Sequence, residues 1–229
     1  PLTSIMGYAE IIEAGIAKPA DVVPFAGKIR TEAQRLLSLI EDIIRLSQLD
    51  AGGEEIPFEP IELQPLCCTV RSRLQSKADR LGLKIECTGE NATVSGQRRT
   101  LEQMVFNLAD NALAYNRPNG SVTIETGTDS DGAPFVRVSD TGIGIAPADQ
   151  KRVFERFYRV DKSHSKMTGG TGLGLSIVKH GAALHGAALT LDRAPGHDDH
   201  AEAEQNRKEG VCAAIDEHGA HEEPPLVGA

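Results

Sequence analysis

The chain has 229 residues, of which 40% are hydrophobic, and this allows a substantial core in one or two domains. Only 4% of the residues are aromatic and Trp is absent, so the core is expected to be aliphatic. The net charge of −9 argues against a nucleic-acid partner, because nucleic acids bind basic surfaces. The sequence contains no apolar run of ~18 residues and no signal peptide, so we expect no membrane contact from this chain.

Residues 1–53 are predicted to form a helical hairpin. Apolar residues recur at gaps of three and four from Leu2 to Ile16 and again from Ile29 to Ile44, and Pro19 and Pro24 bracket the predicted loop between them. Both stripes are too wide for two helices to bury between themselves. Two hairpins that pair into a dimeric four-helix bundle would bury them, and packing against the chain's own globular domain is the alternative.

A domain of alternating helices and strands is predicted to follow an extended linker at residues 54–64. In chain order we expect a helix, two short strands, a long helix, two strands, a helix and a strand, over residues 65–80, 83–87, 92–94, 98–116, 121–126, 135–138, 175–185 and 187–192. In the long helix Asn107 and Asn111 share one face, which is either a metal and phosphate site or an exposed helix side.

Two glycine-rich turns frame the most informative stretch. The first follows a strand and reads Asp140-Thr141-Gly142-Ile143-Gly144, and its carboxylate can accept a hydrogen bond from a flat ligand while the glycines let the chain turn close beneath it. The second, Gly169 to Gly174, opens onto an apolar helix, whose first N–H groups can cradle phosphate. A base at one turn and phosphates at the other describe a nucleotide site.

The motifs in combination resemble those of sensor histidine kinases. The Asp140 turn, the residues Phe154-Glu155-Arg156-Phe157-Tyr158 and the second glycine turn are similar to the family's G1, F and G2 boxes, and Asn107 to Ala112 is similar to its N box. The resemblance covers about residues 1–196. It implies an α+β chain: the dimerising helical hairpin, then an ATP-binding α/β sandwich of the Bergerat type with a mixed sheet at residues 65–196.

The resemblance also implies roles for single residues, with ATP and Mg²⁺ as cofactors. Asn111 would bind Mg²⁺ with support from Asn107, and Tyr115 would pack beside the adenine that Asp140 recognises. Phe154 and Phe157 would anchor a lid at residues 147–168, from which Arg159 is the first candidate to meet the γ-phosphate, before Lys162 and Lys166. The expected nucleotide-binding residues are Asn107, Asn111, Tyr115, Asp140, Gly142, Ile143, Gly144, Arg159, Lys162, Gly170, Thr171, Gly172, Leu173 and Gly174.

The family's phosphoacceptor histidine would lie five positions before Pro1, so no catalytic residue is expected within the chain. The resemblance implies a cytoplasmic kinase core of a membrane-anchored sensor, a homodimer through residues 1–50, and a response-regulator receiver domain as partner. One residue departs from the pattern: the family usually has Lys or Arg where this chain has Ala114. Loss of that cation predicts weaker ATP binding by ~1–3 kcal/mol.

Residues 197–229 are atypically polar and are predicted to be a disordered tail. Two interpretations exist: a long loop that leads to a last strand at residues 211–215, or loss of the closing strand, as after a frameshift. We favour the second. The histidines of this tail are read as low-complexity sequence and not as a metal site.

The four cysteines, Cys67, Cys68, Cys87 and Cys212, are predicted to be reduced, buried thiols, since adjacent cysteines pair poorly and no C-x-x-C spacing occurs.

Two rival functions stay open. One is another Bergerat-fold ATPase, such as an anti-sigma-factor kinase. The other is a degenerate kinase that acts as a dimeric scaffold without binding nucleotide.

Overall fold

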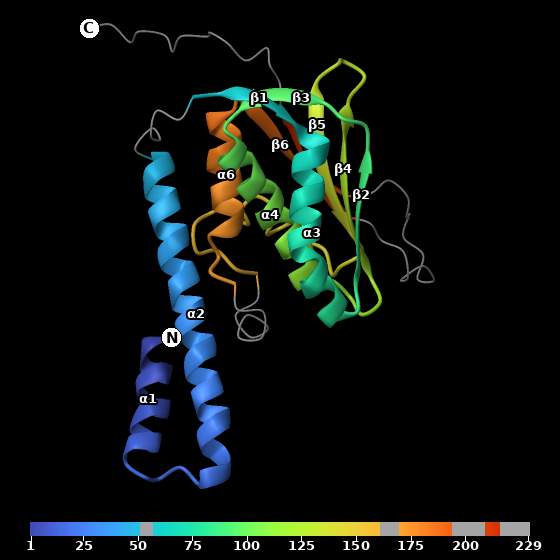
Figure 1. Cartoon of the computed structure of the whole chain (residues 1–229). Helices are drawn as coiled ribbons and strands as arrows, with labels where there is room; N and C mark the ends of the chain where they lie inside the picture. Colours follow the sequence, from blue (N-terminus) through green and yellow to red (C-terminus); the bar gives the residue numbers. More distant parts are fainter. Residues whose placement is uncertain (51–56, 161–169, 194–208, 216–229) are drawn as a thin grey trace, which may run out of the picture.

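A helical hairpin projects from an α/β unit in the computed structural model of the chain (Figure 1), which describes residues 1–50, 57–160, 170–193 and 209–215. The hairpin consists of α1 (Leu2–Glu13) and α2 (Pro19–Asp50). The predicted loop at residues 19–24 is wrong, because α2 begins at Pro19 and includes Pro24. Pro19 occupies the first helical position, where proline is well tolerated. Tyr8 packs against Phe25, next to Pro24, with ring centroids 5.3 Å apart and the rings tilted by 33°.

The α/β unit is built on a five-stranded mixed sheet of order β2-β4-β5-β7-β6. The strands are β2 (Lys84–Gly89), β4 (Ser121–Thr128), β5 (Pro134–Asp140), β6 (Ala187–Arg193) and β7 (Glu209–Ile215). The pair β2 and β4 is parallel and the other pairs are antiparallel. The helices α3 (Leu63–Leu81), α4 (Arg98–Ala114) and α6 (Gly174–Leu184) cover one face of this sheet (Figure 1). The predicted α/β sandwich with a mixed sheet is confirmed.

The predicted linker contains a strand. Residues Glu59–Glu62 form β1, which pairs antiparallel with β3 (Thr93–Gly96), and α3 begins directly afterwards at Leu63. The cause is an apolar pair: Ile61 lies opposite Val94, and both side chains are fully buried. Pro60 suggested a linker, but proline is compatible with a strand that has only one neighbour.

The expectation that the closing strand is lost is also wrong. Strand β7 inserts between β5 and β6 and pairs with both, for example Val138 with Val211 and Leu191 with Val211. The insertion satisfies backbone groups along two strands that would otherwise present open edges. The rest of the predicted tail, residues 197–208 and 216–229, lies outside the described residues.

Helix α4 lies at the centre of the unit and carries two different faces. One face is buried and supplies Leu101, Met104, Val105, Leu108, Ala109, Ala112 and Leu113. The other face carries the half-buried Asn107 and Asn111. Helix α6 packs closely against α4, since a Cβ built on Gly181 would lie 2.6 Å from Met104 Sδ. This close packing sets the start of α6 beside the two asparagines.

Candidate nucleotide site

The turn after β5 is held against the C-terminal end of α4. The Gly142 N–H donates to Asp140 Oδ1 at 2.7 Å, and the Ile143 N–H donates to the Tyr115 carbonyl at 3.1 Å. Asp140 is half-buried, whereas Tyr115 and Ile143 are exposed, Ile143 by 66%. The structure therefore brings the predicted Asp140, Ile143 and Tyr115 together, and they leave an accessible surface beside the carboxylate.

Glycine is required in the middle of this turn. A Cβ on Gly142 would lie 2.5 Å from the Tyr115 carbonyl oxygen and 2.6 Å from Asp140 Oδ1, which is closer than any side chain tolerates. Gly144 has a φ of +72°, a conformation that favours glycine. Asn116 supports the same turn, because its Oδ1 accepts a hydrogen bond from the Thr141 hydroxyl at 3.1 Å.

The second glycine turn is tied to α4 through Asn107. The Asn107 Nδ2 donates to the Gly174 carbonyl at 3.1 Å, and Asn107 Oδ1 accepts from Gln103 Nε2 at 2.7 Å. Asn107 thus holds the start of α6, and its predicted support of a magnesium ion at Asn111 stays a prediction. The sequence analysis missed Gln103, although its position four residues before Asn107 on a helix is a recognisable signal.

Asn111 lies beside Gly174 and has a different environment. Its Nδ2 would lie 3.7 Å from a Cβ on Gly174. Within the described part of the chain, no hydrogen bond engages the Asn111 side chain. Its amide is therefore available to a ligand. A neutral amide oxygen suits Mg²⁺, which prefers oxygen ligands and retains several waters. Among the described residues no three His, Cys, Asp or Glu side chains converge on a possible metal position.

The glycine turn also contacts the hairpin. The Thr171 hydroxyl donates to Asp42 Oδ2 at 2.7 Å, and Leu173 is fully buried against Leu46 and Ile177. The side chains of Thr171 and Leu173 therefore hold the turn, and the main chain is what this turn offers to a ligand. Asp42 and Leu46 were missed because they lie more than 120 residues away in sequence, and no local pattern reveals such a contact.

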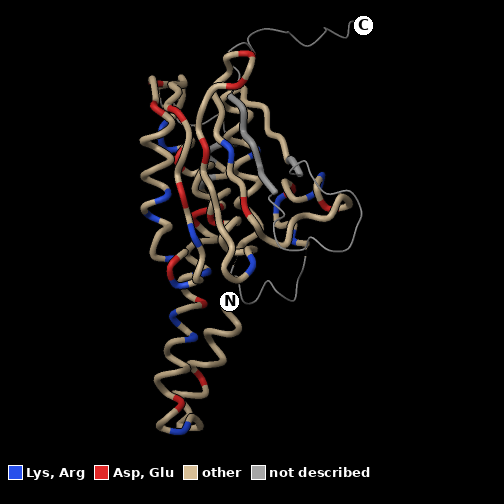
Figure 2. The backbone as a smooth tube through the Cα atoms, turned by 90° about the vertical axis from the view of Figure 1, so that its right-hand side faces the viewer, with Lys and Arg blue, Asp and Glu red and all other residues tan. Residues whose placement is uncertain are grey.

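Residues 147–160 are the described part of the predicted lid, and Figure 2 draws the backbone of the chain with its Lys and Arg positions in blue. The Phe157 N–H donates to the Gly172 carbonyl at 2.9 Å, and Arg159 Nη1 donates to the Gly170 carbonyl at 2.5 Å. Phe154 is half-buried, but the Phe157 side chain is 60% exposed, so its anchoring role stays a prediction. Lys162 and Lys166 lie outside the described residues.

Electrostatics favour an anion at the start of α6. Leu173, which precedes the helix, makes no side-chain cap, so the first N–H groups are open to a ligand.

In the lid, the Tyr158 hydroxyl donates to Asp149 Oδ1 at 2.5 Å, and this bond raises the pKa of Tyr158 above 10.0. Tyr158 is therefore a neutral donor that holds the lid loop to Asp149.

Two family models divide the chain between them. Residues 96–210 match the histidine kinase-, DNA gyrase B- and HSP90-like ATPases, and residues 1–52 match the His Kinase A phospho-acceptor domain. The chain belongs to the two-component sensor histidine kinases. Both motif groups read from the sequence, the helical hairpin and the paired glycine turns, fall within these matches.

Two relatives of this histidine kinase are named as a sensor-like histidine kinase and a sensor protein. The sensor-like histidine kinase SenX3 of Mycolicibacterium smegmatis is 38% identical over 198 residues, which cover 86% of this chain and 51% of SenX3. The phosphate regulon sensor protein PhoR of Pseudomonas aeruginosa is 34% identical over 201 residues, which cover 86% of this chain and 44% of PhoR. The chain spans about half the length of the curated relatives it matches.

Solved structures of other proteins share the fold. The Acinetobacter baumannii kinase AdeS aligns with a TM-score of 0.71 at 23% identity over 94% of both chains. Full-length ShkA, solved in complex with AMPPNP, aligns with a TM-score of 0.64 at 26% identity over 94% of this chain and 44% of its own. None of the helices that the structure describes combines the length and apolarity needed to cross a membrane.

Proposed function

We propose that this histidine kinase chain binds Mg-ATP between α4, the turn after β5 and the glycine turn before α6. In the longer protein the γ-phosphoryl group passes to a histidine upstream of Pro1, and then to an aspartate on a response-regulator receiver domain. The observation that carries the proposal is the position of α4, which contacts both glycine turns. ShkA, whose structure contains an ATP analogue, shares this fold.

In this proposal the base turn recognises adenine. Asp140 accepts a hydrogen bond from the base, and the Gly142 N–H holds the carboxylate in position at 2.7 Å. Tyr115 and Ile143 supply exposed apolar surface for the ring faces. Gly142 and Gly144 keep side chains away from the place where the base approaches the main chain.

The other end binds the triphosphate and the metal. Asn111 supplies an amide oxygen to Mg²⁺, and Asn107 fixes the start of α6, whose N–H groups meet the phosphates. Arg159 lies at Gly170 and provides positive charge there. When bound, Mg-ATP supplies the phosphoryl group, and the chain contributes positioning and charge neutralisation. Ala114 leaves one fewer cation at this end, which is consistent with weak affinity.

Calorimetric titration with Mg-ATP tests the nucleotide site. We expect micromolar-to-millimolar binding by the wild type and no measurable binding by Asp140→Asn. The reason is that Asn replaces the acceptor with a group that also presents a donor to the base. Asn111→Ala should lose most of the magnesium-dependent part of the affinity and retain weak binding without the metal.

Asp131→Asn is a matched control, because Asp131 is an exposed residue of the turn between β4 and β5, at the opposite end of β5 from Asp140. It should bind like the wild type. Absence of binding by a folded wild-type chain would contradict the kinase proposal and favour the dimeric scaffold. The anti-sigma-factor alternative is disfavoured by the phospho-acceptor match over residues 1–52.

We also propose that the hairpin forms a homodimer. Helix α1 has no buried residue, and α2 exposes an apolar stripe at Leu37, Ile40 and Ile44, whose side chains are 58%, 46% and 52% exposed. These positions follow helical spacing and lie on the opposite side of α2 from Asp42 and Leu46, which contact the glycine turn. One face of α2 therefore serves the nucleotide unit and the other is free for a second hairpin.

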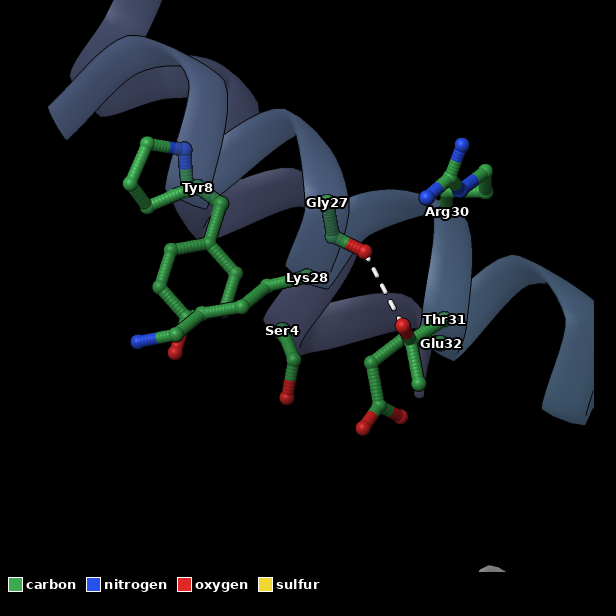
Figure 3. Close-up of a pocket in the computed structure, with 8 residues that line it drawn as sticks. Ser4, Tyr8, Gly27, Lys28, Arg30, Thr31 and Glu32 are labelled. Carbon is green, nitrogen blue, oxygen red and sulfur yellow. Dashed lines mark hydrogen bonds between the residues drawn. The ribbon is translucent and has the colours of Figure 1, made fainter. Parts of the chain in front are cut away.

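The groove shown in Figure 3 lies between α1 and α2 and is lined by Ser4, Tyr8, Gly27, Lys28, Thr31 and Glu32, among others. The Thr31 hydroxyl donates to the Gly27 carbonyl at 3.0 Å, and Lys28 Nζ lies 5.1 Å from the Tyr8 ring centroid. This polar groove has no glycine turn or asparagine pair. We therefore assign the nucleotide to the α/β unit and not to this groove.

Light scattering after size-exclusion chromatography tests the dimer. Ile40→Glu should shift the chain to a monomer at micromolar concentration, because it introduces an unpaired charge into the apolar interface. The neighbouring exposed Glu41→Gln should remain dimeric. A wild-type monomer would contradict the dimer while leaving the nucleotide site intact.

We place the working kinase in the cytoplasm, where ATP and receiver domains are present.

A further inference from the structure

Two cysteines far apart in sequence lie side by side in the fold. Cys68 on α3 and Cys87 on β2 share a hydrogen bond between their sulfurs, with a Sγ–Sγ distance of 3.0 Å. Arg71 supports the same contact between the two elements, since its Nε donates to the Ile85 carbonyl at 3.3 Å. A disulfide bond is ~2.05 Å long, so the sulfurs would need to approach each other by only about 1 Å.

The pair lies where solvent can reach it. Among the strands that the structure describes, β2 is at the edge of the five-stranded sheet and has β4 as its one neighbour. Cys68 is exposed and Cys87 is half-buried, whereas Cys67 is fully buried in the core. The adjacent cysteines thus point to different environments, and of these two only Cys68 is both accessible and paired with a distant thiol.

We propose that Cys68 and Cys87 are a modification site that forms a reversible intrachain disulfide on exposure to a peroxide. Peroxide oxidises the Cys68 thiol to a sulfenic acid: an S–O bond forms, the O–O bond breaks and one water leaves. Cys87 Sγ then attacks Cys68 Sγ, the S–O bond breaks, and the Cys87 proton leaves with the departing oxygen as a second water. Two thiols and one hydrogen peroxide give one disulfide and two waters.

The environments of the two thiols assign their order of reaction. Burial, followed by the hydrogen bond with Cys68, raises the pKa of Cys87 from 9.0 to about 12. Cys87 is therefore protonated and unreactive alone at neutral pH, because the thiolate is the nucleophile. The exposed Cys68 reacts with the oxidant first and Cys87 resolves it. Since the second step requires deprotonation of Cys87, disulfide formation should accelerate as the pH rises.

Non-reducing peptide mass spectrometry of the folded chain after treatment with hydrogen peroxide tests the proposal. We expect a linkage between the tryptic peptides that contain Cys68 and Cys87, with loss of two hydrogens, and its reversal by dithiothreitol. Trypsin does not separate Cys67 from Cys68, so variants decide between them. The linkage should persist in Cys67→Ala and disappear in Cys68→Ser and Cys87→Ser.

Circular dichroism before and after oxidation confirms that each variant and each product is folded. A trapped Cys68 sulfenic acid with Cys87 still reduced would overturn the proposal. So would a linkage between Cys67 and Cys68, or a chain dimer joined through Cys68. None of these outcomes depends on nucleotide binding, so the test is independent of the proposed kinase function.

Discussion

The two glycine turns of the site differ in what holds them. The turn after β5 is fixed within the α/β unit, by backbone contact with Tyr115 and by the lack of space around Gly142. The turn before α6 is fixed partly by Asn107 on α4 and partly by Asp42 and Leu46 on the hairpin. The turn proposed to meet the base is therefore held within one domain. The turn proposed to meet the phosphates is also held by the hairpin.

Among the variants that separate the two turns, the largest effect is expected from adding one methyl group to the turn after β5. Gly142→Ala places a Cβ 2.5 Å from the Tyr115 carbonyl oxygen, so the turn must shift, at a cost of ~1–3 kcal/mol. Mg-ATP affinity, measured by calorimetry, should fall by roughly 10- to 100-fold.

Gly174→Ala is the matched change at the other turn. Its Cβ would lie 3.7 Å from Asn107 and Asn111, which is ordinary van der Waals contact. The chain should stay folded, with its melting temperature unchanged or raised, because Ala is favoured over Gly in a helix by ~1 kcal/mol. Equal losses of affinity in both variants would contradict the difference between the turns.

A smaller effect is expected from loosening the hairpin contact. Leu46→Ala removes a buried side chain from the cluster with Leu173 and Ile177, at a cost of about 2 kcal/mol. Hydrogen exchange should accelerate at residues 170–177 and stay unchanged at residues 140–144. Glu41→Ala, at an exposed position of the same helix, is the control and should change neither segment.

The smallest effect concerns the far end of α6, which is held by His185. The Gln97 N–H donates to His185 Nε2 at 3.0 Å, so the ring proton lies on Nδ1, next to the Gly181 carbonyl at 2.7 Å. Burial lowers the pKa of His185 below 6.5. The unfolded chain therefore binds the proton more readily, and stability should fall as the pH drops below about 6.5.

Thermal unfolding between pH 7 and pH 5 measures this dependence. The melting temperature of the wild type should decrease with pH, and the decrease should be shallower in His185→Gln. A steeper slope in His185→Gln would contradict the assignment of a neutral, buried imidazole.

Some features of the fold were predictable and others were not, for identifiable reasons. The helical stripe of α4 and the alternation in β4 and β5 are local patterns, and the structure confirms those elements. Strand β1 was not predicted, because Pro60 suggested a linker and no local pattern shows that Ile61 pairs with Val94. Strand β7 was rejected because its two partners, β5 and β6, are separated from it by residues with no strand signal.

The sequence by itself determined the family and the hairpin with its ATP-binding unit. It also determined where the two glycine turns and the asparagine pair lie along the chain, because each of these features depends on residue type and short spacing. The tertiary structure decided which residues meet. It alone joins Thr171 to Asp42 and Cys68 to Cys87, and it divides α2 into two opposite faces. Contacts between residues far apart in sequence depend on how whole elements pack, and no local pattern encodes that packing.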